Sequence, residues 1–123
     1  MITLGNIMID CPDDNALQSF YQNLLGWEPF IYFGLPALRN ESGLVIMFSA
    51  EEDYCAPVWP EEEGSQQKQM HFDFQCDDLE ASLAHAEQLG AHRAEQQFGG
   101  DDFITMIDPA GHPFCLCRSS NAG

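Results

Sequence analysis

His71 and Asp73 are the residues of this chain with the clearest potential for chemistry. The segment "HFDFQC" (71–76) alternates in type and predicts a strand with one polar face, which carries His71, Asp73 and Gln75. A carboxylate two positions from an imidazole lies on the same face of the strand and can orient it for hydrogen bonding or proton transfer. No second catalytic group is evident, so we expect the pair to shape a polar cleft, with acid–base catalysis as the alternative.

Two cysteines form a second candidate group, because Cys115 and Cys117 alternate onto one face of the strand predicted at 113–118. A reactive thiol needs a nearby cation or helix N-terminus, and the surrounding acidic sequence offers neither. We therefore expect both side chains to be an inert lining. The five cysteines are odd in number and form no CxxC motif, which favours reduced thiols over a disulfide framework.

The elements that must position these residues occur twice in the chain. "NIMIDCPDDNALQSFYQNLLGW" (6–27) matches "HFDFQCDDLEASLAHAEQLGA" (71–91), and each predicts a strand, an Asp-rich turn and a helix that ends at Leu-Gly. Downstream, "NESGLVIMF" (40–48) matches "DPAGHPFCL" (108–116), with Gly43 over Gly111. The repeat predicts two βαβββ modules, at about 1–55 and about 69–118, joined by a linker at about 56–68.

Each predicted helix carries an apolar stripe at helical spacing, which is typical of a face packed on a sheet. The stripes are Leu17, Phe20, Tyr21, Leu24 and Leu25 in the first helix, and Leu79, Leu83, Ala86 and Leu89 in the second. Further strands are predicted at 30–33, 36–39 and 44–49, and at 93–97, 102–107 and 113–118. The expected fold class is α+β, with the two modules forming a curved mixed sheet around a cleft.

The helix of each module covers one face of its sheet, so the polar face of each first strand is expected to line the cleft. The residues on those faces are Asn6, Met8, Asp10, His71, Asp73 and Gln75. Trp59, in the predicted linker, is expected to be either a packing anchor or a lid over the cleft.

The charge balance excludes some partners. Four basic against twenty acidic residues give a net charge of −16, which repels nucleic-acid phosphates and anionic membrane surfaces. No apolar run approaches the roughly 20 residues of a membrane span, and no secretory signal is recognisable, so we expect a cytoplasmic protein. Exposed sheet edges favour a homodimer.

The segments "FYQNLLGW" (20–27), "HFDFQCDDLEAS" (71–82) and "DPAGHPFCLC" (108–117) resemble the vicinal-oxygen-chelate superfamily of glyoxalase I, bleomycin-resistance proteins and extradiol dioxygenases. The resemblance implies four metal-ligand positions, which fall here on Asn6, Met47, His71 and Cys115. Only His71 is a usual ligand of a catalytic divalent metal. No cofactor is therefore expected; the alternatives are a divalent metal, or Cu(I) on the softer side chains.

The resemblance and the ligand types together favour a metal-independent small-molecule binding protein of the bleomycin-resistance kind. A lyase or isomerase of the glyoxalase kind and a dioxygenase of the extradiol kind are the alternatives. The expected ligand-binding residues are Asn6, Met8, Asp10, Met47, His71, Asp73, Gln75 and Cys115.

Overall fold

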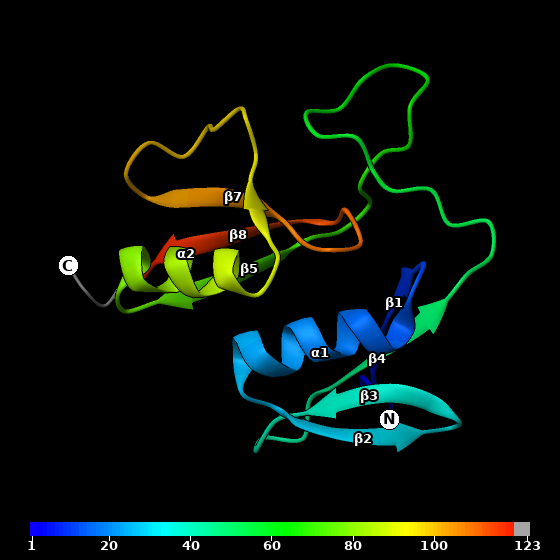
Figure 1. The fold of residues 1–123 in the computed structure, drawn as a ribbon. Coiled ribbons are helices and arrows are strands. Elements are labelled where there is room, and N and C mark those ends of the chain that lie inside the picture. Colours follow the sequence, from blue (N-terminus) through cyan, green and yellow to red (C-terminus); the bar gives the residue numbers. More distant parts are fainter. Residues whose placement is uncertain (120–123) are drawn as a thin grey trace. The chain divides into compact units, whose positions relative to one another are not determined.

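The computed structural model describes residues 1–119 and divides into two compact units, residues 1–54 and the chain from Cys55 onward (Figure 1). The first unit contains β1 (Ile7–Cys11), α1 (Asp14–Leu25), β2 (Glu28–Tyr32), β3 (Leu35–Arg39) and β4 (Val45–Ala50). The second contains β5 (Phe72–Cys76), α2 (Leu79–Gln88), β6 (His92–Arg93), β7 (Phe103–Ile107) and β8 (Pro113–Arg118). The predicted α+β fold of two βαβββ modules is confirmed.

Each unit has its own four-stranded mixed sheet, with strand order β1-β4-β3-β2 in the first and β5-β8-β7-β6 in the second. The first and last strands of each module are parallel neighbours, and the other pairs are antiparallel. Met8 pairs with Met47 in the first sheet, and Asp73 pairs with Cys115 in the second. The internal repeat of the sequence therefore extends to the register of individual residues.

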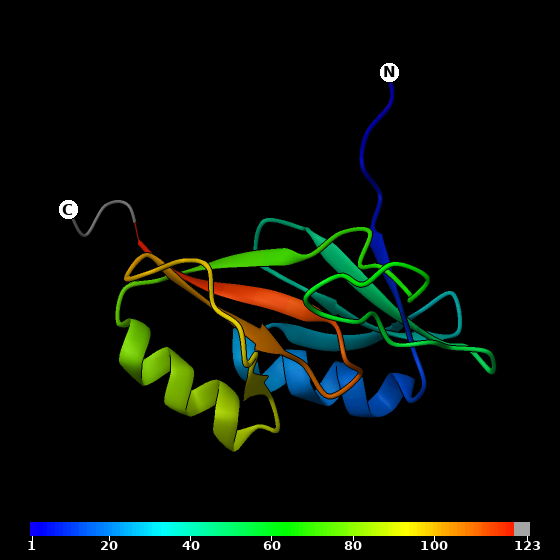
Figure 2. The same cartoon turned by 90° about the horizontal axis from the view of Figure 1, so that it is seen from above.

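The helix of each unit lies along one face of that unit's sheet (Figure 2). Helix α1 begins after the N-cap Asp13, whose carboxylate accepts a hydrogen bond from the Ala16 N–H, and ends at Gly26 with φ of 72°. Its buried residues are Leu17, Phe20 and Tyr21. The Tyr21 ring stacks on Phe48 of β4 with 6.1 Å between centroids, which fixes the helix against the sheet.

Helix α2 follows the same plan. Asp78 is its N-cap, and Leu79, Leu83 and Ala86 are buried, as the apolar stripe predicts. After the helix, Gly90 has φ of 113°, and the N–H of Ala91 donates to the carbonyl of Ala86, which is the Schellman arrangement of a helix end. Among the described residues, neither helix has the length and apolar character needed to cross a bilayer.

The turn before the last strand is also repeated. Asn40 and Asp108 each donate a backbone hydrogen bond to the carbonyl four residues ahead and accept one on their own carbonyl from Gly43 or Gly111. Each also accepts, on a side-chain oxygen, the backbone N–H four residues ahead. Gly43 and Gly111 have φ of 92° and 93°, a conformation that favours glycine, so the turn depends on these residue types.

The strand predicted at 93–97 is wrong in its extent, because β6 contains only His92 and Arg93. Beyond Ala94, the side chain of Gln97 takes the place of a neighbouring strand. Its amide donates to the carbonyls of Ala94 and Thr105, and its oxygen accepts the Thr105 N–H at 2.8 Å. Backbone groups of β7 are thereby satisfied by a side chain, which alternation cannot reveal.

Candidate functional site

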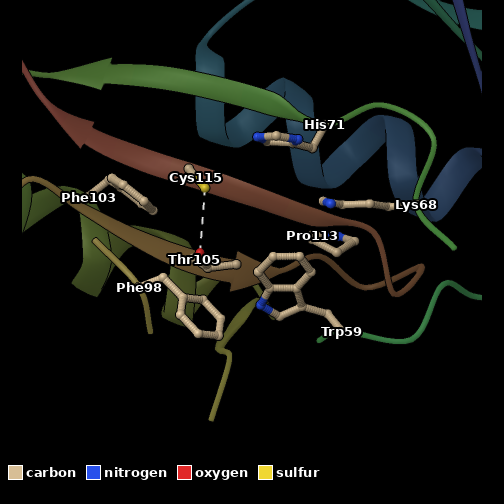
Figure 3. Close-up of a pocket in the computed structure, with 8 residues that line it drawn as sticks. All are labelled: Trp59, Lys68, His71, Phe98, Phe103, Thr105, Pro113 and Cys115. Atoms are coloured by element: carbon tan, nitrogen blue, oxygen red, sulfur yellow. Dashed lines mark hydrogen bonds between the residues drawn. The ribbon is translucent and has the colours of Figure 1, made fainter. Parts of the chain in front are cut away.

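The second unit contains a cavity of about 190 Å³ over β7 and β8 (Figure 3). It is lined by Trp59, Lys68, His71, Phe98, Phe103, Thr105, Pro113 and Cys115. All eight residues belong to the second unit. We call this cavity the aromatic pocket, because three of its walls are aromatic rings.

Trp59 and Phe98 form one side of the aromatic pocket. Their rings meet edge to face, with 5.9 Å between centroids and an interplanar angle of 89°, and the nitrogen edge of the indole is turned toward the Phe98 ring (Figure 3). The Trp59 Nε1 atom is buried and makes no hydrogen bond to the described residues. A Cβ atom on Gly99 would lie 2.4 Å from the Phe103 carbonyl oxygen, so the loop that holds Phe98 requires glycine there.

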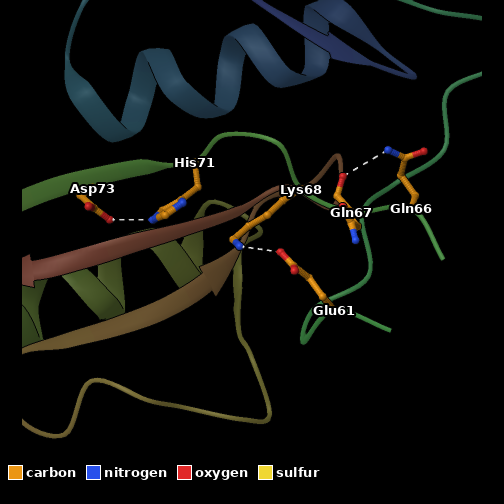
Figure 4. A network of polar contacts seen from close by, with 6 residues as sticks. All are labelled: Glu61, Gln66, Gln67, Lys68, His71 and Asp73. Atoms are coloured by element: carbon orange, nitrogen blue, oxygen red, sulfur yellow. Dashed lines mark hydrogen bonds and ion pairs between the residues drawn. The ribbon is translucent and has the colours of Figure 1, made fainter. Parts of the chain in front are cut away.

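Lys68 supplies an ammonium group to the lining of the aromatic pocket. Its Nζ atom lies 4.5 Å from the centroid of the Trp59 ring and 2.9 Å from Oε1 of Glu61 (Figure 4). The side chain is 20% exposed, so its stem is packed and its position is fixed from two sides. Lys68 is thus an ordered cation beside an aromatic wall.

The His71–Asp73 pair predicted from the sequence is present. His71 Nε2 lies 3.2 Å from Asp73 Oδ1, and the two side chains are 37% and 59% exposed (Figure 4). The carboxylate orients the imidazole, whose ring lines the aromatic pocket. The geometry fits a hydrogen-bonding group or a proton acceptor at the pocket wall.

Both thiols of β8 have a raised pKa, which favours their protonated form. Burial, together with the negative charge of Asp73 and the neighbouring thiols, raises the pKa of Cys117 to about 11. Burial also raises the pKa of Cys115, against the opposing effect of its contact with the Thr105 hydroxyl, 3.6 Å from the sulfur. The raised pKa values disfavour the reactive thiolate on either residue. Of the two, Cys115 lines the aromatic pocket.

The other predicted site residues lie in the two units as follows. In the first unit, Met8 and Asp10 are exposed on β1, Asn6 precedes that strand and is half-buried, and Met47 on β4 is 3% exposed. In the second unit, one ligand atom from each of His71, Asp73 and Cys115 falls within 4.8 Å of the others. Gln75 is exposed and pairs with Cys117 in the sheet.

Sequence reasoning missed most of the aromatic pocket. Lys68 was placed in a linker, and the remaining residues without a predicted role are Phe98, Phe103, Thr105 and Pro113. One signal was available: Lys68 is one of only four basic residues in a strongly acidic chain. Trp59, expected as an anchor or a lid, forms a pocket wall.

The residues at the four metal-ligand positions implied by the resemblance do not fit a hard divalent cation. Met47 offers a buried thioether, Asn6 an amide, and Cys115 a thiol whose pKa is raised by burial. His71 is the usual ligand type among them, and its Nε2 atom already faces Asp73. Asn6, Met47 and Cys115 are therefore poor donors for a catalytic divalent ion.

Comparison with known proteins identifies the family. A model described as "Glyoxalase-like domain" matches residues 6–117. The chain belongs to the glyoxalase-like domain family, which confirms the resemblance to the vicinal-oxygen-chelate superfamily seen in the sequence. No curated protein matches the chain by sequence.

Solved structures share the fold. A glyoxalase/bleomycin resistance protein/dioxygenase family enzyme from Burkholderia phytofirmans is 16% identical, with a TM-score of 0.71 over 95% of this chain and 98% of its own. The fosfomycin resistance protein FosX from Listeria monocytogenes is 19% identical, with a TM-score of 0.67 over 98% and 95%. An integron cassette protein from V. cholerae is 18% identical, with a TM-score of 0.64 over 98% and 97%.

Proposed function

We propose that this protein binds a small organic molecule in the aromatic pocket of its second unit and does so without a metal ion. The carrying observation is the pocket itself: apolar walls with a few convergent polar groups are the usual composition of a ligand site. Trp59 and Phe98 provide contact area, and Lys68 and His71 provide orientation.

Family membership supports the proposal, because proteins with this fold include small-molecule binders. One structural neighbour is named a glyoxalase/bleomycin resistance protein, from Albidiferax ferrireducens. A FosX variant was solved with Mn(II) and 1S,2S-dihydroxypropylphosphonic acid. Metal independence of this chain rests on its own Asn6, Met47 and Cys115, which are poor ligands for such an ion.

The test uses the two tryptophans of the chain. In a Trp27→Phe variant, Trp59 is the sole tryptophan, and its fluorescence reports directly on the pocket wall. A metabolite screen should find compounds that change this fluorescence saturably and raise the melting temperature, because a ligand that binds the folded state stabilises it. Trp59→Ala should abolish the thermal shift.

Metal analysis of untagged protein completes the test. We expect much less than one Ni²⁺, Zn²⁺, Mn²⁺ or Fe²⁺ per chain and unchanged ligand affinity in EDTA. One tightly held ion per chain, or loss of binding in EDTA, would refute metal independence. Absence of any saturable ligand in the screen would refute the binding function.

The His71–Asp73 pair favours a second candidate, a lyase or isomerase of the glyoxalase kind that transfers a proton. A ligand found in the screen is then converted to a product, and His71→Gln removes conversion while retaining binding. Asp73→Asn should reduce the rate less, because it only orients the imidazole. Binding without conversion would leave the first proposal as the function.

We also propose a homodimer. In the first unit, the edge strand β2 and the turn after it expose Ile31 and Phe33, at 67% and 83%. An apolar sheet edge is a common pairing surface. Light scattering should give twice the chain mass for the wild type and the chain mass for Ile31→Lys; a monomeric wild type would contradict this.

A further inference from the structure

We infer that the ligand of the aromatic pocket is a single aromatic ring that bears a carboxylate, with Lys68 as the charge partner. The inference rests on the proposed binding function and names the chemical class of its ligand. It follows from the size, the charge and the arrangement of the lining side chains.

The size of the cavity fits one ring. An apolar cavity of about 150 Å³ is enough to bind benzene, whereas pockets for drug-sized molecules begin at about 300 Å³. The aromatic pocket, at about 190 Å³, has room for one ring and one small substituent.

The charge of the lining points to an anion. Acidic residues outnumber basic ones by twenty to four in the chain, yet the lining includes Lys68 and no acidic side chain. The nearest carboxylates, on Glu61 and Asp73, contact Lys68 and His71 but are not part of the lining. A bound ligand therefore meets the Lys68 ammonium directly, whereas these two carboxylates contact the basic side chains from outside the lining.

Lys68 is suited to hold a carboxylate. An ammonium group has three donors, and Glu61 takes one of them at 2.9 Å. Because the side chain is mostly buried and held over Trp59, little conformational entropy remains to be lost when a ligand binds. A carboxylate at the same end as His71 would also accept a hydrogen bond when the imidazole is protonated.

The aromatic walls are suited to hold a ring. Trp59, Phe98 and Phe103 line the cavity together, and His71 and Lys68 lie across from Trp59 and Phe98 (Figure 3). Offset-stacked and edge-to-face contacts with such rings add to the free energy of burial. A saturated ring of the same size would gain the free energy of burial but not the additional free energy of the aromatic contacts.

A cationic ligand is the competing class, since the net charge of −16 attracts cations at long range. Salt screens that attraction beyond about 8 Å at physiological ionic strength. At the pocket, Lys68 itself occupies the region over the Trp59 ring where a ligand cation would bind. A cation would have to displace it, whereas a carboxylate would pair with it.

The experiment compares five probes by Trp59 fluorescence in the Trp27→Phe variant: benzoate, benzyl alcohol, cyclohexanecarboxylate, acetate and benzylamine. We expect benzoate to bind tightest and benzyl alcohol about tenfold weaker or more, because a neutral hydroxyl accepts a weaker hydrogen bond from the Lys68 ammonium than a carboxylate does. Cyclohexanecarboxylate should fall between them, and acetate and benzylamine should bind least.

Three variants test the role of Lys68. Lys68→Met should weaken benzoate about tenfold and benzyl alcohol much less. Arg93→Met is the matched control, because it removes one positive charge from the same unit at an exposed site that pairs with Glu87 outside the pocket lining. Glu61→Gln should tighten benzoate, because it removes the carboxylate that competes for the Lys68 ammonium.

The outcomes separate this inference from the proposed function. Benzyl alcohol or benzylamine binding as tightly as benzoate would overturn the carboxylate class and leave a small-molecule binder. Equal loss of benzoate affinity in Arg93→Met would show that only total charge matters and would overturn the role of Lys68. If none of the five probes binds but a compound from the metabolite screen does, the ligand class is wrong and the function stands; if nothing binds, both are wrong.

Discussion

The two units share their backbone plan and differ in chemistry at matched positions. In the first, β1 and β4 place Met8 beside Met47; in the second, β5 and β8 place Asp73 beside Cys115 in the same register. Asn6 precedes β1 as His71 precedes β5. The fold therefore depends on positions where the units agree, whereas the candidate site depends on positions where they differ.

The positions of agreement are apolar or conformationally special. Phe48 and Leu116 are matched core residues, exposed by 0% and 2%, and Gly43 and Gly111 occupy the same left-handed turn position. None of these residues can take part in acid–base or charge chemistry. Divergence at the polar face of the strands therefore changes the site without a large penalty to folding.

The largest effects are expected in the matched cores. Phe48→Ala and Leu116→Ala should lower the free energy of unfolding by about 3–5 and about 2–5 kcal/mol, because each leaves a cavity under its helix. Denaturant titration measures both, with the exposed Met8→Ala as the control, expected within about 0.5 kcal/mol of wild type. A small effect for only one of the two would show that the units are not equivalent in packing.

The two matched turns should contribute differently to the free energy of unfolding. Asp108 is 2% exposed, and one carboxylate oxygen accepts the N–H groups of Ala110 and His112; Asn40 is half-buried and neutral. Asp108→Ala should cost about 2–3 kcal/mol and Asn40→Ala about 1 kcal/mol, because hydrogen bonds to charged groups contribute more. Asp108→Asn keeps an acceptor and should fall between them; equal losses for both alanine variants would contradict the role of charge.

The thiol of Cys117 replaces Ser49 of the first unit and should react slowly. With its pKa raised to about 11, mainly by burial, its alkylation by iodoacetamide should accelerate about tenfold per pH unit from pH 7 to 10. The sign follows from the thiolate, which is the reactive form and grows as pH approaches the pKa. Peptide mass mapping gives the rate.

Asp73→Asn serves as the matched variant for Cys117, because the Asp73 carboxylate contributes to the raised pKa after burial. The variant should be alkylated faster than wild type at the same pH. A pH-independent rate in the wild type would show that access, and not protonation, controls the reaction.

The smallest effect on stability is expected when a residue of the second unit is replaced by the residue type at the matched position of the first unit. His71→Asn introduces the residue type of position 6 at an exposed site, and the free energy of unfolding should change by less than about 0.5 kcal/mol. Benzoate affinity should nevertheless fall, because the imidazole lines the pocket. A large loss of stability with unchanged affinity would make His71 a structural residue.

The sequence predicted the elements well because the repeat, the N-cap aspartates and the apolar stripes are local signals. It also predicted the His71–Asp73 pair, since residues two apart on a strand share a face. It could not predict that Lys68 and Phe98, thirty positions apart, line one pocket, because loop geometry depends on tertiary contacts. Leu25 and Phe74 fit the apolar pattern, yet they are only half-buried, because alternation gives a face and not its depth.

Gln97 has a consequence for how this protein can diversify. Its side-chain amide satisfies backbone groups of Ala94 and Thr105. Residues 95–98 therefore stay outside the ladder of backbone hydrogen bonds that joins the strands of the sheet. A segment outside the ladder carries no constraint of alternation or register. Exchanges at residues 95, 96 and 98 can therefore accumulate in descendants of this gene and alter ligand preference, while Gln97 and Gly99 keep the segment in place and the sheet is inherited unchanged.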